Sequence, residues 1–384
     1  MATIGIDASR AVTAQRTGTE NYSYQLIRHL LPLAGTHTIR LYYNASPPPD
    51  LFPAQAQPRV IPFPRLWTHL RLSWEMARHA PDLLFVPSHV LPAVHPRRSV
   101  VTVHDLGYLY YPEAHPTLSR WYLDLSTRYN ARVATRVIAD SAATQRDLMA
   151  RYGIPAAKIT VVYPGRDPAI APVRDGARLA ATLARYRLAP GYILYVGTLH
   201  PRKNLTRLVE AYALLRQQPP PRGGWPPLVL AGKRGWMYDR LRARVRELGL
   251  EREVIFPGYV PQADLAALYS GAACLAMPSL YEGFGLPVLE AMACGVPVVA
   301  ADASSLPEVA GDAALLVAPT DVTGWAAALA RLLVEAPLQR ELVARGFEQA
   351  ARFSWQRCAR ETLAVLEEAL ATTPKACPIA PPPP

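Results

Sequence analysis

Two glutamates separated by eight positions (290 − 282 = 8) are the residues in this chain with the clearest chemical potential. They bound a string that follows an apolar, strand-like run and opens a helix-like one: Glu282, Gly283, Phe284, Gly285, Leu286, Pro287, Val288, Leu289 and Glu290. Proline suits the first helical turn, and the amides beside it, with the helix dipole, would attract a phosphate. Because carboxylates accept hydrogen bonds from hydroxyls, we expect one glutamate to hold a sugar and the other a ribose. The alternative is an acidic helix start that only favours the dipole.

A second string places two cations at the end of a loop. It runs from an apolar stretch through Gly197 and Thr198 to Arg202, Lys203 and Asn204, with a helix-like segment after it. We expect Asn204 to be the N-cap of that helix. Arg202 and Lys203 would neutralise a diphosphate leaving group, whereas the alternative is a pair of solvated surface cations.

The first half of the chain offers two weaker candidates. His104, followed by Asp105, ends an apolar run, where an imidazole would bind a sugar hydroxyl, help to deprotonate an acceptor, or only make structural hydrogen bonds. Gly18 follows the first apolar run and would bring the backbone close to a phosphate. No D-x-D string suggests a metal clamp on a diphosphate, so we expect no metal. We also expect no cofactor.

Short β-rich runs alternate with helix-period segments along the whole chain, a pattern typical of parallel βαβ units. Segment 45–64 is rich in proline and is predicted to be an irregular loop. The predicted strands are 3–8, 38–43, 83–87, 100–104, 136–140, 159–162, 192–196, 228–231, 254–256, 274–277, 298–301 and 314–317.

The predicted organisation is therefore α/β, with two Rossmann-like parallel-sheet domains facing an interdomain cleft. Ligands bind beyond the carboxyl ends of strands in such sheets. The expected division is a first domain, a linker, a second domain, a last helix and a disordered proline-rich tail: 1–168, 169–190, 191–353, 354–372 and 373–384.

Composition restricts the class of protein. The 384 residues are half hydrophobic and 18% charged, which indicates a globular chain, and the four cysteines form no C-x-x-C pair. No long apolar run or signal-peptide pattern is visible, so we expect a cytoplasmic location. The formal net charge of +11 fits peripheral membrane contact better than nucleic acid, for which no binding motif is present.

The Glu282 to Glu290 string resembles the E-x7-E motif of retaining GT-B glycosyltransferases of family 4, in their mannosyltransferase-like members. Further agreement covers nearly the whole chain and is most specific between Gly191 and Pro319. It includes Gly258-Tyr259-Val260, Pro278-Ser279, Ala293 to Val299, Ser305 to Ala313, His104-Asp105 and Phe353-Ser354-Trp355.

The resemblance implies that 1–168 is the acceptor-side domain, that 191–353 binds the nucleotide sugar, and that the helix at 354–372 crosses back to the first domain. It also implies a role for each matching position. Glu282 would contact the donor hexose, and Glu290 would bind the ribose. The backbone of Gly283, Phe284, Gly285 and Leu286 would hold sugar and phosphate; Arg202 and Lys203 would stabilise the departing diphosphate. The remaining implied contacts are Val260 near the base, His104 near the donor sugar, Gly18 near the diphosphate, and Gly197 and Thr198 beside the donor.

Two positions depart from the family pattern. Many relatives have an arginine where this chain has Thr198, and two adjacent glycines where it has Gly18-Thr19. The resemblance implies a retaining, metal-independent transfer of a hexose from a nucleotide sugar to a glycan or lipid-linked acceptor in polysaccharide biosynthesis. GDP-mannose is the first expectation for the donor and a UDP-hexose the second. The alternatives are a nucleotide-sugar epimerase or phosphorylase on the same fold, or a basic module that binds nucleic acid or membrane without catalysis.

Overall fold

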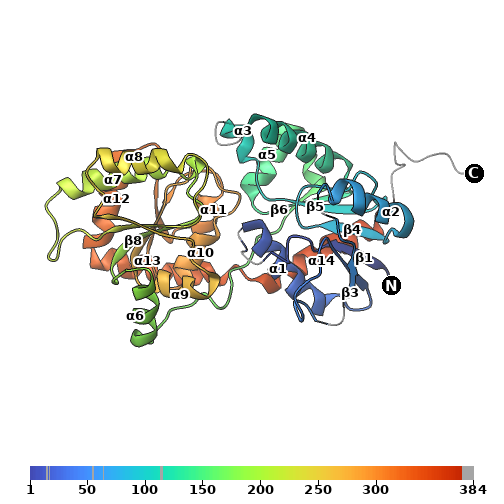
Figure 1. Cartoon of the computed structure of the whole chain (residues 1–384), viewed down its shortest axis with the longest axis horizontal. Helices are drawn as coiled ribbons and strands as arrows, with labels where there is room; N and C mark the ends of the chain where they lie inside the picture. The colour runs from blue at the N-terminus through green and yellow to red at the C-terminus, as the bar shows by residue number, and fades with distance from the viewer. Residues whose placement is uncertain (14–15, 17, 54–55, 64, 113–115, 374–384) are drawn as a thin grey trace, which may run out of the picture. The chain divides into compact units, whose positions relative to one another are not determined.

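A computed structural model describes residues 1–13, 16, 18–53, 56–63, 65–112 and 116–373. The chain divides into two compact units (Figure 1). Unit 1 comprises residues 1–106, 118–165 and 354–384, and unit 2 comprises 107–117 and 166–353. The tail predicted at 373–384 lies outside the described residues except for position 373.

Unit 1 is built on a parallel sheet in which every described pair of neighbours runs in the same direction. The chain moves outward from β1 on one side and returns to continue on the other. The spatial order is β3 (Gln57–Val60), β2 (Thr38–Tyr43), β1 (Thr3–Asp7), β4 (Leu83–Val86), β5 (Ser99–Val103), β6 (Arg136–Ala139) and β7 (Ile159–Val161).

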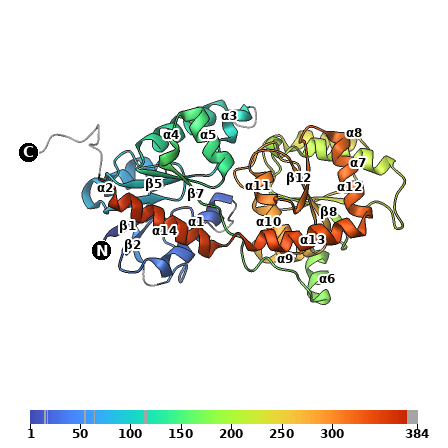
Figure 2. The same ribbon diagram turned by 180° about the vertical axis from the view of Figure 1, so that it is seen from behind.

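Helices flank this sheet, and one of them comes from the far end of the sequence. Helix α14 (Trp355–Ala371) packs along α1 (Gly18–Leu30), as both ribbon views show (Figures 1 and 2). A Cβ on Gly165 would lie 2.0 Å from the amide nitrogen of Trp355, so the chain passes directly beside the start of α14. The other helical segments of unit 1 are η1 (Leu31–Leu33), η2 (Thr68–Leu72), α2 (Ser73–His79), α4 (Thr117–Val133), α5 (Ala142–Tyr152) and η4 (Ala156–Lys158).

Unit 2 repeats the same construction with its own parallel sheet. Four of its strands, at 192–196, 228–231, 272–277 and 298–301, are apolar and largely buried because helices cover both faces, whereas the two edge strands are partly exposed. The spatial order is β10 (Val254–Gly258), β9 (Leu228–Ala231), β8 (Tyr192–Val196), β11 (Ala272–Met277), β12 (Val298–Ala301) and β13 (Ala314–Val317).

The helices of unit 2 are α3 (Gly107–Tyr110), α6 (Gly176–Arg185), η5 (Pro201–Lys203), α7 (Leu205–Gln217), α8 (Tyr238–Glu247), α9 (Gln262–Ser270), α10 (Leu286–Ala293), α11 (Leu306–Ala310), α12 (Val322–Val334) and α13 (Ala336–Ala351). From α7 onward they mostly follow the strands in βα alternation, whereas α3 lies in the segment 107–117 and α6 precedes β8. The predicted class, two parallel-sheet Rossmann-like domains, is confirmed by the two sheets.

Two segments differ from the sequence-based expectation. The predicted loop at 45–64 contains strand β3, which pairs with β2 at the sheet edge, where a proline is tolerated. The predicted linker at 169–190 contains the helix that the sequence predicts near 177–186, which is α6, but this helix packs against α9 and belongs to unit 2. Pairing and packing partners far away in the sequence decide both cases.

Candidate functional site

The strongest candidate site of unit 2 lies at the carboxyl ends of β8 and β11. These strands are neighbours, but the chain leaves β8 toward β9 on one side and leaves β11 toward β12 on the other. The loops after the two strands therefore diverge, and this topological switch point is where open α/β sheets bind ligands. The loop after β8 carries Lys203, and the loop after β11 carries Glu282.

An ion pair joins these two loops. The Nζ atom of Lys203 lies 2.5 Å from Oε1 and 2.7 Å from Oε2 of Glu282. The hydroxyl of Ser279 donates to the same Oε1 at 2.6 Å. Both charged side chains are largely buried, with exposed fractions of 14% for Lys203 and 9% for Glu282. The sequence predicted both residues but not their direct pairing.

The backbone after Glu282 is fixed by two serines from the loop after β12. Ser304 and Ser305 both donate to the carbonyl oxygen of Glu282, and Ser305 also donates to that of Phe284 at 2.7 Å. Gly285 then turns the chain into α10 with φ of 113°, and its Cβ would lie 2.8 Å from Leu306. Only glycine fits this position without strain.

The start of α10 agrees with the sequence-based expectation. Pro287 lies in the first turn, and the first amides of a helix have no carbonyl one turn earlier to accept from them. Gly283 and Leu286 are partly exposed there, whereas the ring of Phe284 is buried against Phe353. The site can therefore use the backbone of this turn, but not the Phe284 ring, toward a ligand.

The loops after β8 and β9 approach each other through glycines. Gly197 has φ of 152°, and a Cβ on Gly232 would lie only 1.8 Å from the carbonyl oxygen of Gly197. Leu199 pairs with the β9 loop through hydrogen bonds of 2.9 and 3.1 Å. Thr198, between them, is exposed.

Asn204 occupies the expected N-cap position of α7, but its side chain does not cap the helix. It has left-handed backbone angles, φ 59° and ψ 29°, and makes no capping hydrogen bond. Instead its amide nitrogen donates to the carbonyl oxygens of Pro278 at 3.0 Å and Pro319 at 2.6 Å. The expected capping role is therefore wrong, because the Asn204 side chain donates to carbonyl groups that are distant in the sequence. These hydrogen bonds join three loops of the site.

Glu290 lies in α10 with different neighbours from Glu282. The hydroxyl of Tyr269 in α9 donates to its Oε2 at 2.8 Å. Burial raises the pKa of Glu290 to about 7, the charge of Asp167 adds to the shift, and the Tyr269 hydrogen bond opposes it. A carboxyl group poised near neutral pH in this way is a feature of functional sites.

Arg202 is held in the same loop as Lys203. Its carbonyl oxygen accepts from the Leu280 amide at 2.9 Å, which fixes the β8 loop against the β11 loop. Its guanidinium lies 6.0 Å from the ring centroid of Tyr281, which stacks on Tyr110 at 5.3 Å. A second cation is therefore positioned near the pair, in a partly exposed place.

Sequence reasoning missed a cation in the loop after β9. The Nζ atom of Lys233 lies 5.0 Å from the ring centroid of Tyr259, and Tyr259 directly precedes the predicted contact residue Val260, which is 5% exposed. Because β9 adjoins β8 and β10 adjoins β9, this group extends the same sheet edge. The string Gly232-Lys233-Arg234-Gly235 was its only signal in the sequence.

In unit 1, the structure engages both ring nitrogens of His104. Nδ1 lies 2.6 Å from Asp140 Oδ2, and Nε2 lies 3.1 Å from the carbonyl oxygen of Pro87. Burial is the largest single influence and lowers the pKa of His104, but the charge and hydrogen bond of Asp140, the hydrogen bond to Pro87 and the charge of Asp105 together raise it above the usual value. Because acceptors face both ring nitrogens, this arrangement favours a protonated ring and a positioning role over a role as base.

His89, after β4, was not singled out from the sequence. Its Nε2 is buried and has no hydrogen-bond partner among the described residues. Burial, together with the charges of His104 and Arg10, lowers the pKa of His89 to about 4. A neutral imidazole therefore stands near the switch point of unit 1, between β1 and β4. Gly18 begins α1, and a Cβ there would meet no atom within 4 Å.

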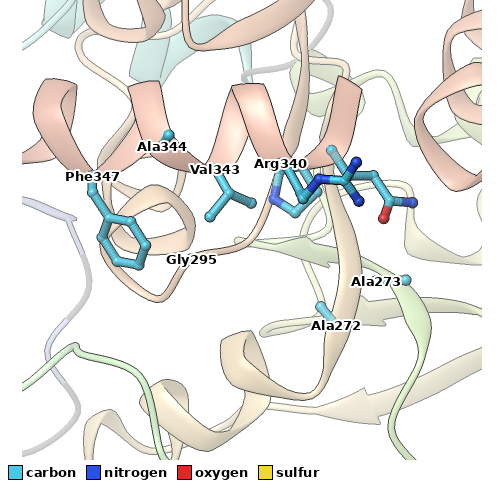
Figure 3. Close-up of a pocket in the computed structure, with 9 residues that line it drawn as sticks. Ala272, Ala273, Gly295, Arg340, Val343, Ala344 and Phe347 are labelled. Carbon is cyan, nitrogen blue, oxygen red and sulfur yellow. The ribbon is translucent and has the colours of Figure 1, made fainter. Parts of the chain in front are cut away.

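A separate hollow of about 510 Å³ lies at the opposite edge of the unit 2 sheet (Figure 3). It lies between α13, which contributes Arg340, Val343 and Phe347, and the start of β11 at Ala272. None of the predicted site residues lines it. Within the described ranges, no cluster of three or more metal-ligating side chains is present.

Comparison with known proteins identifies the chain. The model of the glycosyl transferases group 1 matches residues 187–349, and that of Glycosyltransferase Family 4 matches residues 16–170. The O-antigen chain mannosyltransferase B of Escherichia coli is 33% identical, over 93% of this chain and 98% of that one. The chain belongs to glycosyltransferase family 4. This glycosyltransferase is therefore an enzyme, and a purely non-enzymatic binding module is set aside.

Solved structures agree on the fold of the glycosyltransferase. Sucrose-phosphate synthase from Thermosynechococcus elongatus aligns with a TM-score of 0.74 at 22% identity, covering 97% of this chain and all of that one. Anabaena HepE, solved in complex with UDP and glucose, aligns with a TM-score of 0.70 at 20% identity, covering 96% of this chain and all of that one. The predicted family and GT-B fold are thereby confirmed.

Proposed function

We propose that this glycosyltransferase transfers a hexose from a nucleoside-diphosphate sugar that unit 2 binds, and mannose is the first candidate for this hexose. The transfer retains the configuration at the anomeric carbon and needs no metal. The single observation that carries the proposal is the buried Lys203–Glu282 pair at the β8–β11 switch point. A fixed cation beside a fixed carboxylate suits a ligand that combines a diphosphate with a sugar.

Each part of the donor then has a proposed partner. Lys203 and Arg202 bind the diphosphate, as do the amides at the start of α10. Glu282 binds hydroxyls of the hexose, Glu290 binds the ribose, and Val260 lies near the base. Gly197 and Gly285 let the backbone approach because a side chain at either position would collide with a neighbour.

The reaction breaks the bond between C1 of the sugar and the diphosphate oxygen and forms a bond from C1 to the acceptor oxygen. Negative charge grows on the leaving diphosphate, and the cations stabilise it. The contacts of Glu282 support front-face attack over a covalent intermediate, because Lys203 and Ser279 already engage its oxygens. In that route the acceptor proton passes to the departing diphosphate.

Mannose is proposed because the relative that spans nearly the whole chain is named a mannosyltransferase. GDP-mannose is the first candidate, and a UDP-hexose is the second, as one structural neighbour was solved with UDP and glucose. The proposed acceptor is a glycan or lipid-linked glycan in polysaccharide biosynthesis, to which His104 and Gly18 of unit 1 would contribute.

We further propose that the enzyme works at the cytoplasmic face of a membrane through peripheral contact. No helix among the described residues is long and apolar enough to cross a bilayer. The net charge of +11 favours an anionic surface.

Donor choice can be tested by thermal unfolding with GDP-, UDP- and ADP-sugars. A ligand at about one hundred times its Kd stabilises the folded state by about 2.7 kcal/mol, so the correct donor should stand out. A donor-only assay separates transfer from epimerisation, because an epimerase would convert the sugar without an acceptor.

The site assignment can be tested with Lys203→Met and Glu282→Gln, which remove charge but keep shape. We expect each to lower kcat about a hundredfold to a thousandfold. Each single variant leaves one buried charge without its opposite charge in this ion pair and should lower stability, whereas the double variant should regain stability without regaining activity.

The matched control is Arg216→Ala, which removes a cation from an exposed pair with Glu253, 3.2 Å away on the same unit. It should keep full activity. Full activity in both Lys203→Met and Glu282→Gln would end the site assignment, while loss of activity in the control would make the effect a general one of charge.

A further inference from the structure

Helix α4 carries its large apolar side chains on its exposed face, whereas a helix of a water-soluble domain usually buries them. Its buried residues are Thr127, Asn130 and Ala131, which are small or polar. Its exposed face carries large apolar and aromatic side chains instead: Leu118 at 84% exposed, Trp121 at 56%, Tyr122 at 47%, Leu125 at 61% and Tyr129 at 46%. A surface helix ordinarily does the opposite.

The exposed set is a regular stripe rather than a scatter. Leu118, Tyr122, Leu125 and Tyr129 occupy positions i, i+4, i+7 and i+11, which share one face of a helix. Both ribbon views place α4 at the periphery of unit 1 (Figures 1 and 2).

A second element extends the stripe into a surface. The Nε2 atom of His69 in η2 lies 2.7 Å from the hydroxyl oxygen of Tyr122, and the two rings contact each other edge-on. The segment around His69 exposes three more large apolar side chains, Leu66 at 66%, Leu70 at 55% and Trp74 at 54%. We call these eight side chains the α4 surface. Isolated exposed apolar residues need no explanation, but a grouped set marks an interaction site.

The charges around the α4 surface are positive. Arg128 and Arg132 on α4 are exposed, and Arg78 lies 4.1 Å over the Trp74 ring. The nearby acids are engaged inside the unit: Asp124 accepts from Tyr152 at 2.6 Å, and Glu75 is buried against Arg59 at 2.8 Å. Arg128 and Arg78 are therefore available to face an anionic partner, whereas Arg132 also donates to the carbonyl oxygen of Tyr152 at 3.3 Å.

We propose that the α4 surface docks unit 1 onto an anionic lipid bilayer, with Trp74, Trp121 and Leu125 inserted at the level of the head groups. Tryptophan and leucine flanked by arginine are the side chains that interfacial helices use. The arginines attract the negative surface, and the apolar side chains hold the protein there. This inference rests on the peripheral contact proposed above and defines where it occurs.

The test is flotation of the full chain with vesicles of phosphatidylcholine, with or without phosphatidylglycerol. We expect binding to vesicles that contain phosphatidylglycerol and weak binding to phosphatidylcholine alone, with a decrease at high salt as charges are screened. Failure to float with either vesicle would overturn both the contact and its location.

The variant Trp121→Ser/Leu125→Ser should bind these anionic vesicles roughly tenfold to a hundredfold more weakly, because two partly inserted side chains are lost. Its matched control is Trp236→Ser in unit 2, since Trp236 has the same 56% exposure as Trp121. The control should bind as the unsubstituted protein does. Equal binding by the double variant would show that the membrane contact lies elsewhere and would overturn the α4 surface alone.

Two further measurements distinguish docking on a bilayer from donor binding and from self-association. Thermal stabilisation by the nucleotide sugar should persist in Trp121→Ser/Leu125→Ser, because both side chains are exposed and belong to unit 1. This measurement therefore distinguishes donor binding by unit 2 from docking on the bilayer. Light scattering without lipid should show a monomer. An oligomer that dissociates in the double variant would assign the α4 surface to a second copy of the chain and overturn the bilayer proposal.

Discussion

At the scale of single residues, the two glutamates of the Glu282 to Glu290 string are set apart by their surroundings. Glu282 is paired with a cation, whereas the partner of Glu290 among the described residues is the hydroxyl of Tyr269. The same residue type can therefore serve as a fixed carboxylate in one place and titrate near pH 7 in the other. Their equal appearance in the sequence conceals this difference.

This contrast predicts a pH dependence of donor binding. A ribose needs the ionised form of Glu290, which is half populated near pH 7 because burial raises the pKa to about 7. Raising the pH from 6 to 8 should tighten donor binding roughly tenfold. Glu290→Gln should bind more weakly and lose this pH dependence. Calorimetric titration of the nucleotide sugar measures both, and an unchanged pH profile in the variant would contradict the ribose assignment.

His104 gives a second prediction at this scale. His104→Asn should lower the free energy of unfolding by about 3 kcal/mol at pH 6, because Asp140 loses its buried partner. The folded pKa of His104 is raised, so the stabilisation is fully present below pH 6.5 and is lost as pH rises through the folded value. Urea unfolding across this range should show the gap between the two proteins narrowing. A gap that widens with pH would mean that His104 is neutral.

At the scale of elements, the site depends on how loops leave the strands. The carboxyl ends of β8 and β11 are brought together by their parallel pairing, and Asn204, Ser304 and Ser305 then lock the loops that follow. These hydrogen bonds join residues more than twenty positions apart. The turn into α10 is the part that tolerates least change.

Gly285→Ala should therefore lower stability by about 2 kcal/mol and weaken donor binding, since φ is 113° and the new Cβ would meet Leu306. Thermal unfolding with and without donor measures both effects. Gly176→Ala at the start of α6 is the control, where a Cβ meets nothing within 4 Å, and it should be neutral or slightly stabilising. Equal effects of the two substitutions would remove the claim that the turn requires glycine.

At the scale of the whole molecule, the two units are not built from two successive halves of the sequence. Helix α14 follows unit 2 in sequence but belongs to unit 1, where Trp355 is 1% exposed and contacts Tyr22 edge-on at 5.8 Å. Cys358 and Leu366 join the same core. Unit 1 therefore cannot complete its core until the last segment of the chain is present.

Trp355→Ala should cost about 4 kcal/mol, because a large buried side chain leaves a cavity. Hydrogen exchange should show the loss of protection in peptides of unit 1 and not in those of unit 2. The exposed neighbour Gln356→Ala is the control and should change stability by less than about 0.5 kcal/mol. Equal loss of protection across both units would mean that they unfold as one.

The sequence by itself determined the alternating elements, the family and the strings that carry the donor-site candidates. Apolar periodicity and a glycine-rich helix start are local signals, so Pro287 and strands such as β8 and β12 could be read directly. The tertiary structure alone decided which partners those residues have. It pairs Lys203 with Glu282, and it directs the Asn204 side chain to the carbonyl oxygen of Pro319 instead of to its own helix. It also pairs segment 57–60 with β2 as an edge strand and leaves the apolar face of α4 exposed. The physical reason is that hydrogen bonds, ion pairs and burial depend on groups distant in the sequence, which no local pattern encodes.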